Sequence, residues 1–144
     1  RFAVLMQLLK IDNHDAIVKW CEDNAETVRE GYAFSKEAII VWTMMTSTQL
    51  IKRGIRINCT LPGTTETPMM SHFQITTDAA VLQSAVAPIG RRSTPMEQAA
   101  PVVFLNSDAA SYINGAVLPV DGGFMAGVAS GQIESGIVRS GTRK

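Results

Sequence analysis

The stretch that decides the fold is GYAFSKEAIIVWTMMTSTQLIKRGIRINCTLPG, residues 31–63. Ala33–Lys52 contains neither Gly nor Pro and is rich in helix formers, so we expect a helix that stops at Gly54. Ile55–Leu61 is rich in β-branched residues and precedes a Pro-Gly pair, which predicts a strand ending in a turn. Apolar residues cover nearly the whole circumference of the expected helix. This pattern predicts a buried helix, with a sheet on one side and a partner subunit on the other.

Tyr32 and Lys36 stand at the start of this helix and form a candidate proton-transfer pair. Their spacing of four residues puts both side chains on one helix face, with Cβ atoms roughly 5–6 Å apart. A free phenol has a pKa of about 10, and a neighbouring ammonium lowers that pKa because it favours the phenolate. Tyr32 is therefore a candidate general acid/base towards a carbonyl or hydroxyl. A Tyr and a Lys at this spacing also occur in many helices as a solvated pair, and the pair alone does not decide between the two.

Composition excludes several classes of partner. Thirteen Lys and Arg balance thirteen Asp and Glu without a basic run, which argues against nucleic acid or an anionic membrane as the main partner. No apolar run approaches the roughly 20 residues that span a bilayer. Cys21 and Cys59 have no metal-ligand spacing, and His14 and His72 are isolated, so we expect no metal site. Two buried thiols in a reducing compartment, hence a cytoplasmic protein, are expected, with a single disulfide as the alternative.

Other segments predict the remaining elements. We expect an amphipathic helix over Ala16–Arg29, a helix over Ser93–Asn106, an edge strand over Ala116–Val120 and a flexible tail over residues 124–144. The second helix carries a complete start signal. Its members are Thr94 as N-cap, Pro95 at the first position and Glu97 closing a capping box. Its expected buried face consists of Ala99, Val102, Val103 and Leu105.

Several short motifs, in order and at the right spacing, resemble the second half of a short-chain dehydrogenase/reductase. They are Tyr32-Ala-Phe-Ser-Lys36, Gly54-Ile-Arg-Ile-Asn58, Pro62-Gly63-Thr-Thr-Glu-Thr67-Pro68-Met69, Gly90-Arg91-Arg92, Pro95-Met-Glu97-Gln-Ala99, Ser107-Asp108-Ala-Ala-Ser111-Tyr112 and Val120-Asp121-Gly122-Gly123. The resemblance implies an α/β fold, the C-terminal part of a Rossmann-like doubly wound parallel sheet. Residues 1–123 would form the C-terminal portion of one dehydrogenase domain. No Gly-rich phosphate loop precedes Tyr32, so the N-terminal cofactor-binding half is expected to be absent.

The resemblance also implies a reaction. A hydride would pass between a nicotinamide cofactor, NAD or NADP with NAD favoured, and a small-molecule secondary alcohol or ketone. Tyr32 would be the general acid/base, and Lys36 would lower its pKa and bind the nicotinamide ribose. Pro62, Gly63, Thr65 and Thr67 would complete the cofactor site, with the Thr65 backbone and the Thr67 hydroxyl meeting the carboxamide. The alternative for the threonines is that they are only turn and N-cap residues.

Two features near the site remain open. An apolar stretch carrying Met69, Met70 and Phe73 is expected to form a lid over a bulky substrate, with ordinary packed helices as the alternative. The family's substrate-orienting serine is missing about a dozen residues before the tyrosine, where the chain reads Ile17-Val-Lys-Trp-Cys21. Either the site is degenerate or an inserted helix separates the two residues. The insertion is typical of the branch resembling 3α-hydroxysteroid dehydrogenase/carbonyl reductase, which implies a serine upstream of Arg1 and a hydroxysteroid as a candidate substrate.

Two rival functions stay open. The alternatives to the oxidoreductase are a non-catalytic dinucleotide-binding or assembly module of the same fold, and an inactive truncated fragment. By resemblance, we also expect a homodimer or homotetramer formed through the Ala33–Lys52 helix.

Overall fold

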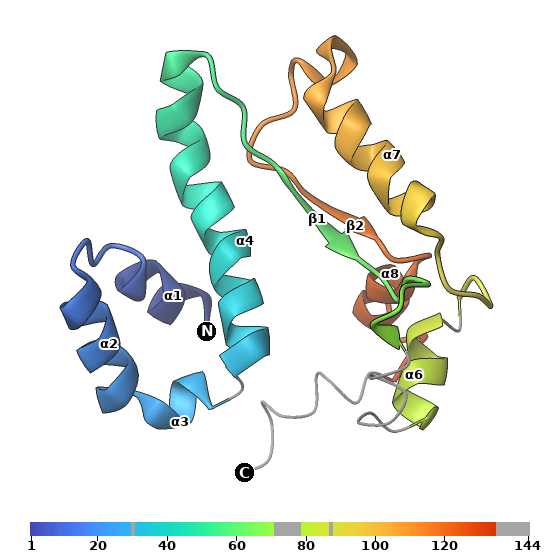
Figure 1. Ribbon diagram of the computed structural model, residues 1–144, viewed down its shortest axis with the longest axis horizontal. Coiled ribbons are helices and arrows are strands. Elements are labelled where there is room, and N and C mark those ends of the chain that lie inside the picture. The colour runs from blue at the N-terminus through green and yellow to red at the C-terminus, as the bar shows by residue number, and fades with distance from the viewer. Residues whose placement is uncertain (30, 71–78, 87, 135–144) are drawn as a thin grey trace. The chain divides into compact units, whose positions relative to one another are not determined.

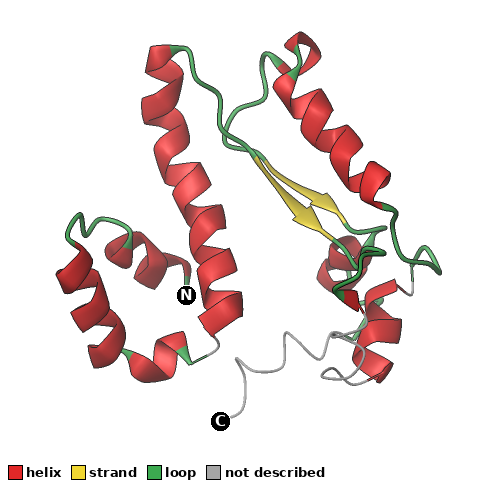
Figure 2. Ribbon diagram, in the orientation of Figure 1, coloured by secondary structure: helices red, strands yellow, loops and turns green. Residues whose placement is uncertain are grey.

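The computed structural model describes residues 1–29, 31–70, 79–86 and 88–134 (Figure 1). These residues form helices and a two-stranded sheet, an α/β arrangement (Figure 2). The chain divides into two compact units. The first holds Arg1–Cys59 and Tyr112–Val117, and the second holds Thr60–Ser111 and the chain from Leu118 onward.

The first unit is built around four helices. They are α1 (Phe2–Leu8), α2 (His14–Asp23), α3 (Ala25–Val28) and α4 (Gly31–Leu50). Leu5 and Leu8 of α1 pack with Phe34 and Val41 of α4 in a buried apolar cluster. Trp20 of α2 stacks on Phe34, with ring centroids 6.5 Å apart. The helices around α4 therefore close a small core of their own.

The single helix predicted over Ala16–Arg29 is wrong, because the structure has two helices that meet at Asn24. The Asn24 side-chain amide donates to the carbonyl of Trp20 at 2.8 Å, as does its backbone N–H at 3.0 Å. The side chain thus competes for the helical acceptor and ends α2. Helix α2 begins at an N-cap, because the Asn13 side chain accepts from the backbone N–H of Ala16 at 3.0 Å.

Helix α4 confirms the predicted helix to within two residues at either end. It continues into a 3₁₀ turn, η1 (Ile51–Arg53), and stops at Gly54, whose φ of 74° suits glycine. Its burial differs from the prediction. The buried positions include Thr43 and Ser47, whose hydroxyls donate to carbonyls of their own helix. Ile39 and Trp42 are about half exposed.

The sheet consists of β1 (Cys59–Pro62) and β2 (Val117–Val120). Cys59 N–H donates to Ala116 O, and Gly63 N–H donates to Val120 O, both at 2.9 Å. Partners advance together along both segments, so the strands are parallel. β1 starts four residues later than the predicted strand. β2 nearly matches the prediction, and in the described part of the chain it pairs with β1 alone.

Two asparagine side chains explain the late start of β1. Asn114 accepts from the Ile57 N–H through Oδ1 (3.0 Å), and Asn58 accepts from the Ala116 N–H through Oδ1 (2.9 Å). Their amide groups donate to backbone carbonyls, Asn58 to Ile113 O and Asn114 to Ser47 O, both at 3.1 Å. Side chains therefore satisfy the backbone where a ladder would otherwise continue.

The second unit contains α6 (Ala79–Val86), α7 (Pro95–Asn106), the 3₁₀ turn η2 (Asp108–Ala110) and α8 (Phe124–Ala129). Helix α8 corrects the prediction of a flexible tail from Phe124. The Asp121 carboxylate accepts from the backbone N–H groups of Gly123 and Met125 and so holds the start of α8. The prediction for 135–144 lies outside the described residues. Within the described ranges, no helix has the length and apolarity needed to cross a bilayer.

The capping box predicted for α7 is confirmed. Thr94 Oγ1 accepts from the Glu97 N–H at 3.3 Å, and Glu97 Oε2 accepts from the Thr94 N–H at 2.8 Å. Glu97 also accepts two hydrogen bonds from the Arg91 guanidinium, at 2.6 and 2.9 Å. The predicted buried face of α7 is confirmed only at Leu105, because Val102 and Val103 are exposed.

This pairing changes the ionisation of both partners. The Arg91 hydrogen bonds, followed by the Thr94 backbone N–H, hold the pKa of Glu97 at about 2, well below its ordinary 4.5. Glu97 in turn raises the pKa of Arg91. Because the folded-state pKa is lowered, the pair stabilises the fold above pH 4.5, and this contribution is lost as the pH falls towards 2.

Asn114→Ala should lower the free energy of unfolding by about 1–3 kcal/mol, because it leaves the half-buried Ile57 N–H without its partner. Urea denaturation of the longest natural protein containing this sequence measures the change. Asn106→Ala is the matched control, since the exposed Asn106 amide bonds only within its own helix, to Val102 O. Equal costs for the two variants would contradict the bridging role of Asn114.

Arg91→Gln should raise the pKa of Glu97 from about 2 towards 4.5, because Arg91 makes the largest contribution to the shift. The pKa should stay below 4.5, because the Thr94 N–H still donates. Carbon-13 NMR titration of the Glu97 carboxyl measures it. Arg92→Gln is the control and should leave this pKa unchanged. An Arg91 variant that behaves like the Arg92 variant would disprove the assignment.

Candidate active site

The pair Tyr32 and Lys36 lies on the first two turns of α4, in the first unit. The Lys36 ammonium lies 5.3 Å from the centroid of the Tyr32 ring, within cation–π range. The two side chains therefore share a helix face, as their spacing predicts. Tyr32 is 73% exposed, so a ligand can reach its hydroxyl. The arrangement places a cation beside an exposed phenol.

The predicted cofactor residues Pro62, Gly63, Thr65 and Thr67 lie in the second unit, where β1 ends. Residues 63–67 are called the β1 turn below. Gly63 is held very close to the neighbouring chain, because a Cβ built on it would lie 2.7 Å from Asp121 Cα. Only glycine fits this approach without a backbone shift. The carboxyl ends of parallel strands are where open α/β sheets bind ligands, so the β1 turn occupies a suitable place.

Thr65 and Thr67 differ in their surroundings. Thr65 is half-buried, and its hydroxyl donates to Gly63 O at 3.0 Å while it accepts from Ser93 Oγ at 2.9 Å. Its backbone N–H has no hydrogen-bond partner within the described ranges. Thr67 is exposed, and its carbonyl accepts from the Met70 N–H. Thr65 thus serves the turn itself, and it leaves a backbone donor for a ligand.

The three predicted lid residues do not behave alike. Met69 is 65% exposed and Met70 is buried at 9%. Phe73 lies outside the described residues. Of the predicted lid residues that the structure describes, Met69 alone is exposed.

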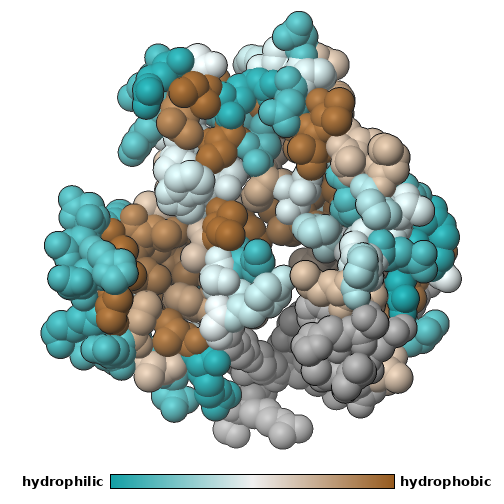
Figure 3. All heavy atoms as spheres, in the orientation of Figure 1, coloured by the Kyte–Doolittle hydropathy of each residue, from teal (hydrophilic) through white to brown (hydrophobic). Residues whose placement is uncertain are grey.

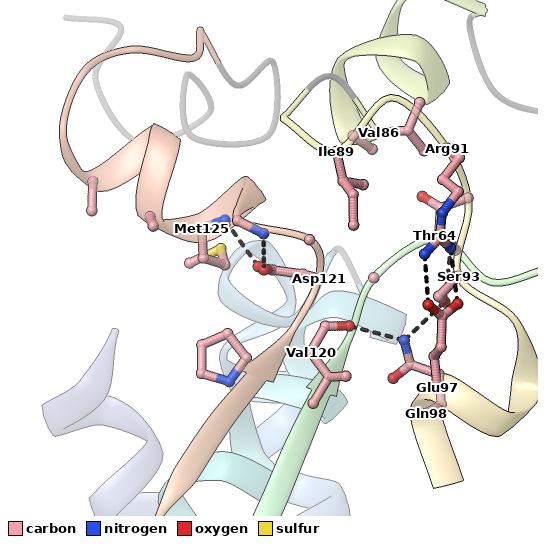
Figure 4. A pocket seen from close by; sticks show the side chains of 17 residues that line it. Thr64, Val86, Ile89, Arg91, Ser93, Glu97, Gln98, Val120, Asp121 and Met125 are labelled. Carbon is pink, nitrogen blue, oxygen red and sulfur yellow. Dashed lines mark hydrogen bonds and ion pairs between the residues drawn. The ribbon is translucent and has the colours of Figure 1, made fainter. Parts of the chain in front are cut away.

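A cavity of about 720 Å³ opens beside the β1 turn (Figure 4). Ile89, Val86 and Met125 are among its apolar walls, and the Arg91–Glu97 pair stands on its polar side. This volume lies within the roughly 300–1,000 Å³ typical of small-molecule sites. The cavity was not predicted, because its walls come from three separate stretches of the chain, 63–64, 85–98 and 119–129.

Sequence reasoning also missed the residues that support the β1 turn. Ser93 forms an isolated parallel bridge with Thr65, and the Gln98 amide reaches Ser93 and Val120. The sequence did contain one indication that the Gln98 side chain makes a hydrogen bond inside the protein. It shares a helical stripe with Val102 and Leu105, and a polar residue in an apolar stripe needs a hydrogen-bond partner.

The comparisons with known proteins agree with this geometry. The family described as enoyl-(acyl carrier protein) reductase matches residues 17–125. A 2,5-dichloro-2,5-cyclohexadiene-1,4-diol dehydrogenase of Sphingobium indicum is 40% identical over 97 residues, which cover 66% of this chain and 38% of that protein. The 3-alpha-hydroxysteroid dehydrogenase/carbonyl reductase of Comamonas testosteroni is 38% identical over 96 residues, covering 66% of this chain and 37% of that protein. The chain therefore spans less than two fifths of the length of these relatives.

A solved structure gives the same result. A protein of Beutenbergia cavernae, assigned as an NAD(P)-dependent gluconate 5-dehydrogenase and holding NADP at low occupancy, aligns with a TM-score of 0.58. It is 38% identical, and the alignment covers 66% of this chain and 38% of that chain. The motifs from Tyr32 to Gly123 all lie inside the matched range 17–125. The chain belongs to the short-chain dehydrogenase/reductase family.

Proposed function

We propose that the protein containing this chain is a nicotinamide-dependent oxidoreductase that interconverts a secondary alcohol and a ketone, with Tyr32 as general acid/base. The observation that carries the proposal is the exposed Tyr32 phenol with the Lys36 ammonium over its ring. Family membership supports the reaction class. The assembled fold we propose is the Rossmann-like doubly wound sheet, to which β1 and β2 contribute two parallel strands.

The chemistry divides between protein and cofactor. A nicotinamide cofactor held by Pro62, Gly63, Thr65 and Thr67 would supply the hydride chemistry, as the acceptor of the hydride from the carbinol carbon of the alcohol. Tyr32, as phenolate, takes the hydroxyl proton, and in the reverse direction the phenol returns that proton to the ketone oxygen. Lys36 stabilises the negative charge on the ring oxygen through its own positive charge. The balance is one hydride and one proton removed from the alcohol.

The residues of the β1 turn fit a nicotinamide carboxamide. A primary amide has one acceptor and two donor positions. The Thr65 N–H, which has no partner among the described residues, can donate to the amide oxygen. The exposed Thr67 hydroxyl can accept from the amide nitrogen. These are the roles that we propose for Thr65 and Thr67, with Pro62 and Gly63 shaping the turn.

The substrate that we propose is a secondary alcohol on an apolar ring, a hydroxysteroid among the candidates. The names of the two curated relatives specify a cyclohexadienediol and a hydroxysteroid. The exposed Met69 side chain beside the β1 turn suits such an apolar substrate. NAD remains the dinucleotide that we predict, and the assay below compares it with NADP.

Helix α4 is also the proposed contact between subunits of a homodimer or homotetramer. Apolar side chains reach the molecular surface (Figure 3), and on α4 they include Ile39 at 50% and Trp42 at 46% exposure. Solvent contact of large apolar side chains on one helix favours burial against a partner.

Tyr32→Phe should lower turnover by a factor of about 10²–10⁴, because it removes the group that exchanges the proton. Its affinity for the dinucleotide should stay within about twofold, since Phe keeps the ring under Lys36. The measurement is the absorbance of reduced nicotinamide with a panel of alicyclic alcohols and ketones, NAD and NADP in parallel. The longest natural protein containing this sequence is the sample.

Tyr112→Phe is the matched control, because Tyr112 is fully exposed and lies outside the proposed site. It should keep ordinary turnover. Ordinary turnover in Tyr32→Phe as well would remove Tyr32 from the mechanism. A wild-type protein that binds the dinucleotide without turnover would favour a non-catalytic relative.

Trp42→Glu should lower the molar mass measured by light scattering, because it places a charge in the proposed contact between subunits and so favours dissociation of the oligomer. Val18→Glu is the control, since Val18 is similarly exposed at 42% on α2. An unchanged mass for Trp42→Glu, or the same loss in both variants, would contradict the assignment of the contact to α4.

A further inference from the structure

The Gln98 side chain joins two acceptors beside the β1 turn (Figure 4). Its Nε2 donates to Ser93 Oγ and to the carbonyl oxygen of Val120, both at 2.9 Å. A carbonyl oxygen only accepts, so the group that faces Val120 must be the NH₂ end of the amide. The orientation of the Gln98 amide is thereby fixed by its surroundings.

Fixing this amide fixes the direction of a chain of hydrogen bonds. Ser93 Oγ accepts from Gln98, and its own hydrogen goes to Thr65 Oγ1 at 2.9 Å, with Thr64 O as a second and longer acceptor at 3.4 Å. The Thr65 hydroxyl then donates to Gly63 O at 3.0 Å. The relay therefore runs from α7 through two hydroxyls to the first carbonyl of the β1 turn.

Backbone hydrogen bonds of Ser93 hold the same turn as well. Ser93 N–H donates to Thr64 O at 3.0 Å, and Glu66 N–H donates to Ser93 O at 2.8 Å. Val120 O, which receives the Gln98 amide, also accepts from the Gly63 N–H at 2.9 Å. Gln98 therefore connects Ser93, which bonds to the β1 turn, with Val120 O, the carbonyl that also accepts from the Gly63 N–H at the end of β1.

We propose that Gln98, acting through Ser93, is a positioning residue that orients the β1 turn for the nicotinamide carboxamide. The inference rests on the proposed function. Its physical content is that the relay occupies the Thr65 hydroxyl, while the Ser93 N–H, bonded to Thr64 O, holds the peptide whose N–H is left for the ligand. Gln98 contributes through this geometry, and its own amide is already engaged by protein acceptors.

The test compares two ligands in the longest natural protein containing this sequence. NADH carries the carboxamide, whereas ADP-ribose lacks the nicotinamide ring. Gln98→Met keeps the length of the side chain and removes its donors. It should weaken NADH binding by about threefold to thirtyfold, as expected when a hydrogen-bonded network loses one donor. ADP-ribose binding, measured by the same calorimetry, should stay unchanged.

Three further variants separate positioning from general damage. Ser93→Ala should weaken NADH binding similarly, Ser93→Thr should preserve it because the hydroxyl remains, and Gln98→Met combined with Ser93→Ala should cost less than the sum. Gln132→Met, at an exposed position of the same unit, is the matched control and should bind like wild type. Amide exchange of Gly63 and Glu66 without any ligand should be faster in Gln98→Met than in Gln132→Met.

The outcomes distinguish the two proposals. Unchanged amide exchange, unchanged NADH affinity, or equal losses for NADH and ADP-ribose would overturn the positioning role of Gln98 and leave the oxidoreductase standing. A wild-type protein that binds neither NADH nor NADPH would overturn the proposed function, and the inference with it. That failure is visible before any substitution is made.

Discussion

The structure depends on pairing the backbone polar groups along two short parallel strands. β1 and β2 are only four residues long, and in the described part of the chain each has the other as its only strand partner. Beyond the ends of the strand pair, side-chain amides complete the hydrogen bonding. Asn58 and Asn114 do so before the strands, and Gln98 does so where they end. An unpaired buried backbone group costs about 1–3 kcal/mol, so these amides determine how far each segment stays extended.

Features that depend on neighbouring residues were predictable. Helix α4, its stop at Gly54 and the capping box of Thr94 and Glu97 all follow from residues at most four positions from their partners. The Tyr32–Lys36 contact belongs to the same class, because helical spacing alone brings the two side chains together. For such pairs, the sequence specifies the geometry as soon as the helix forms.

Features that depend on distant residues were not predictable. Asn58 and Asn114 lie 55 or more residues from the groups they bond across the strand pair, and no local pattern marks those partners. The apolar residues around α4 likewise did not predict which side of the helix is buried, because they lie on nearly all of its sides. Packing instead buries Thr43 and Ser47, whose hydroxyls are satisfied within the helix, and leaves Trp42 partly open. Asn24 is the exception, since the break it makes in the helix is local and arises from competition that helix propensity underestimates.

The candidate site residues fall into one group of each kind, and this has a physical consequence for each group. Tyr32 and Lys36 take their mutual geometry from one helix, so their alignment requires little beyond the stability of α4. The β1 turn takes its geometry from α7 and β2, through Ser93, Gln98 and the carbonyl of Val120. A displacement of about 1 Å at a reacting group can cost a hundredfold in rate, so a turn that meets a ligand must be held as firmly as the helix. Helical spacing fixes the geometry of the Tyr32–Lys36 pair, and long-range hydrogen bonds fix the geometry of the β1 turn. The order of the turn therefore depends on the packing of the second unit.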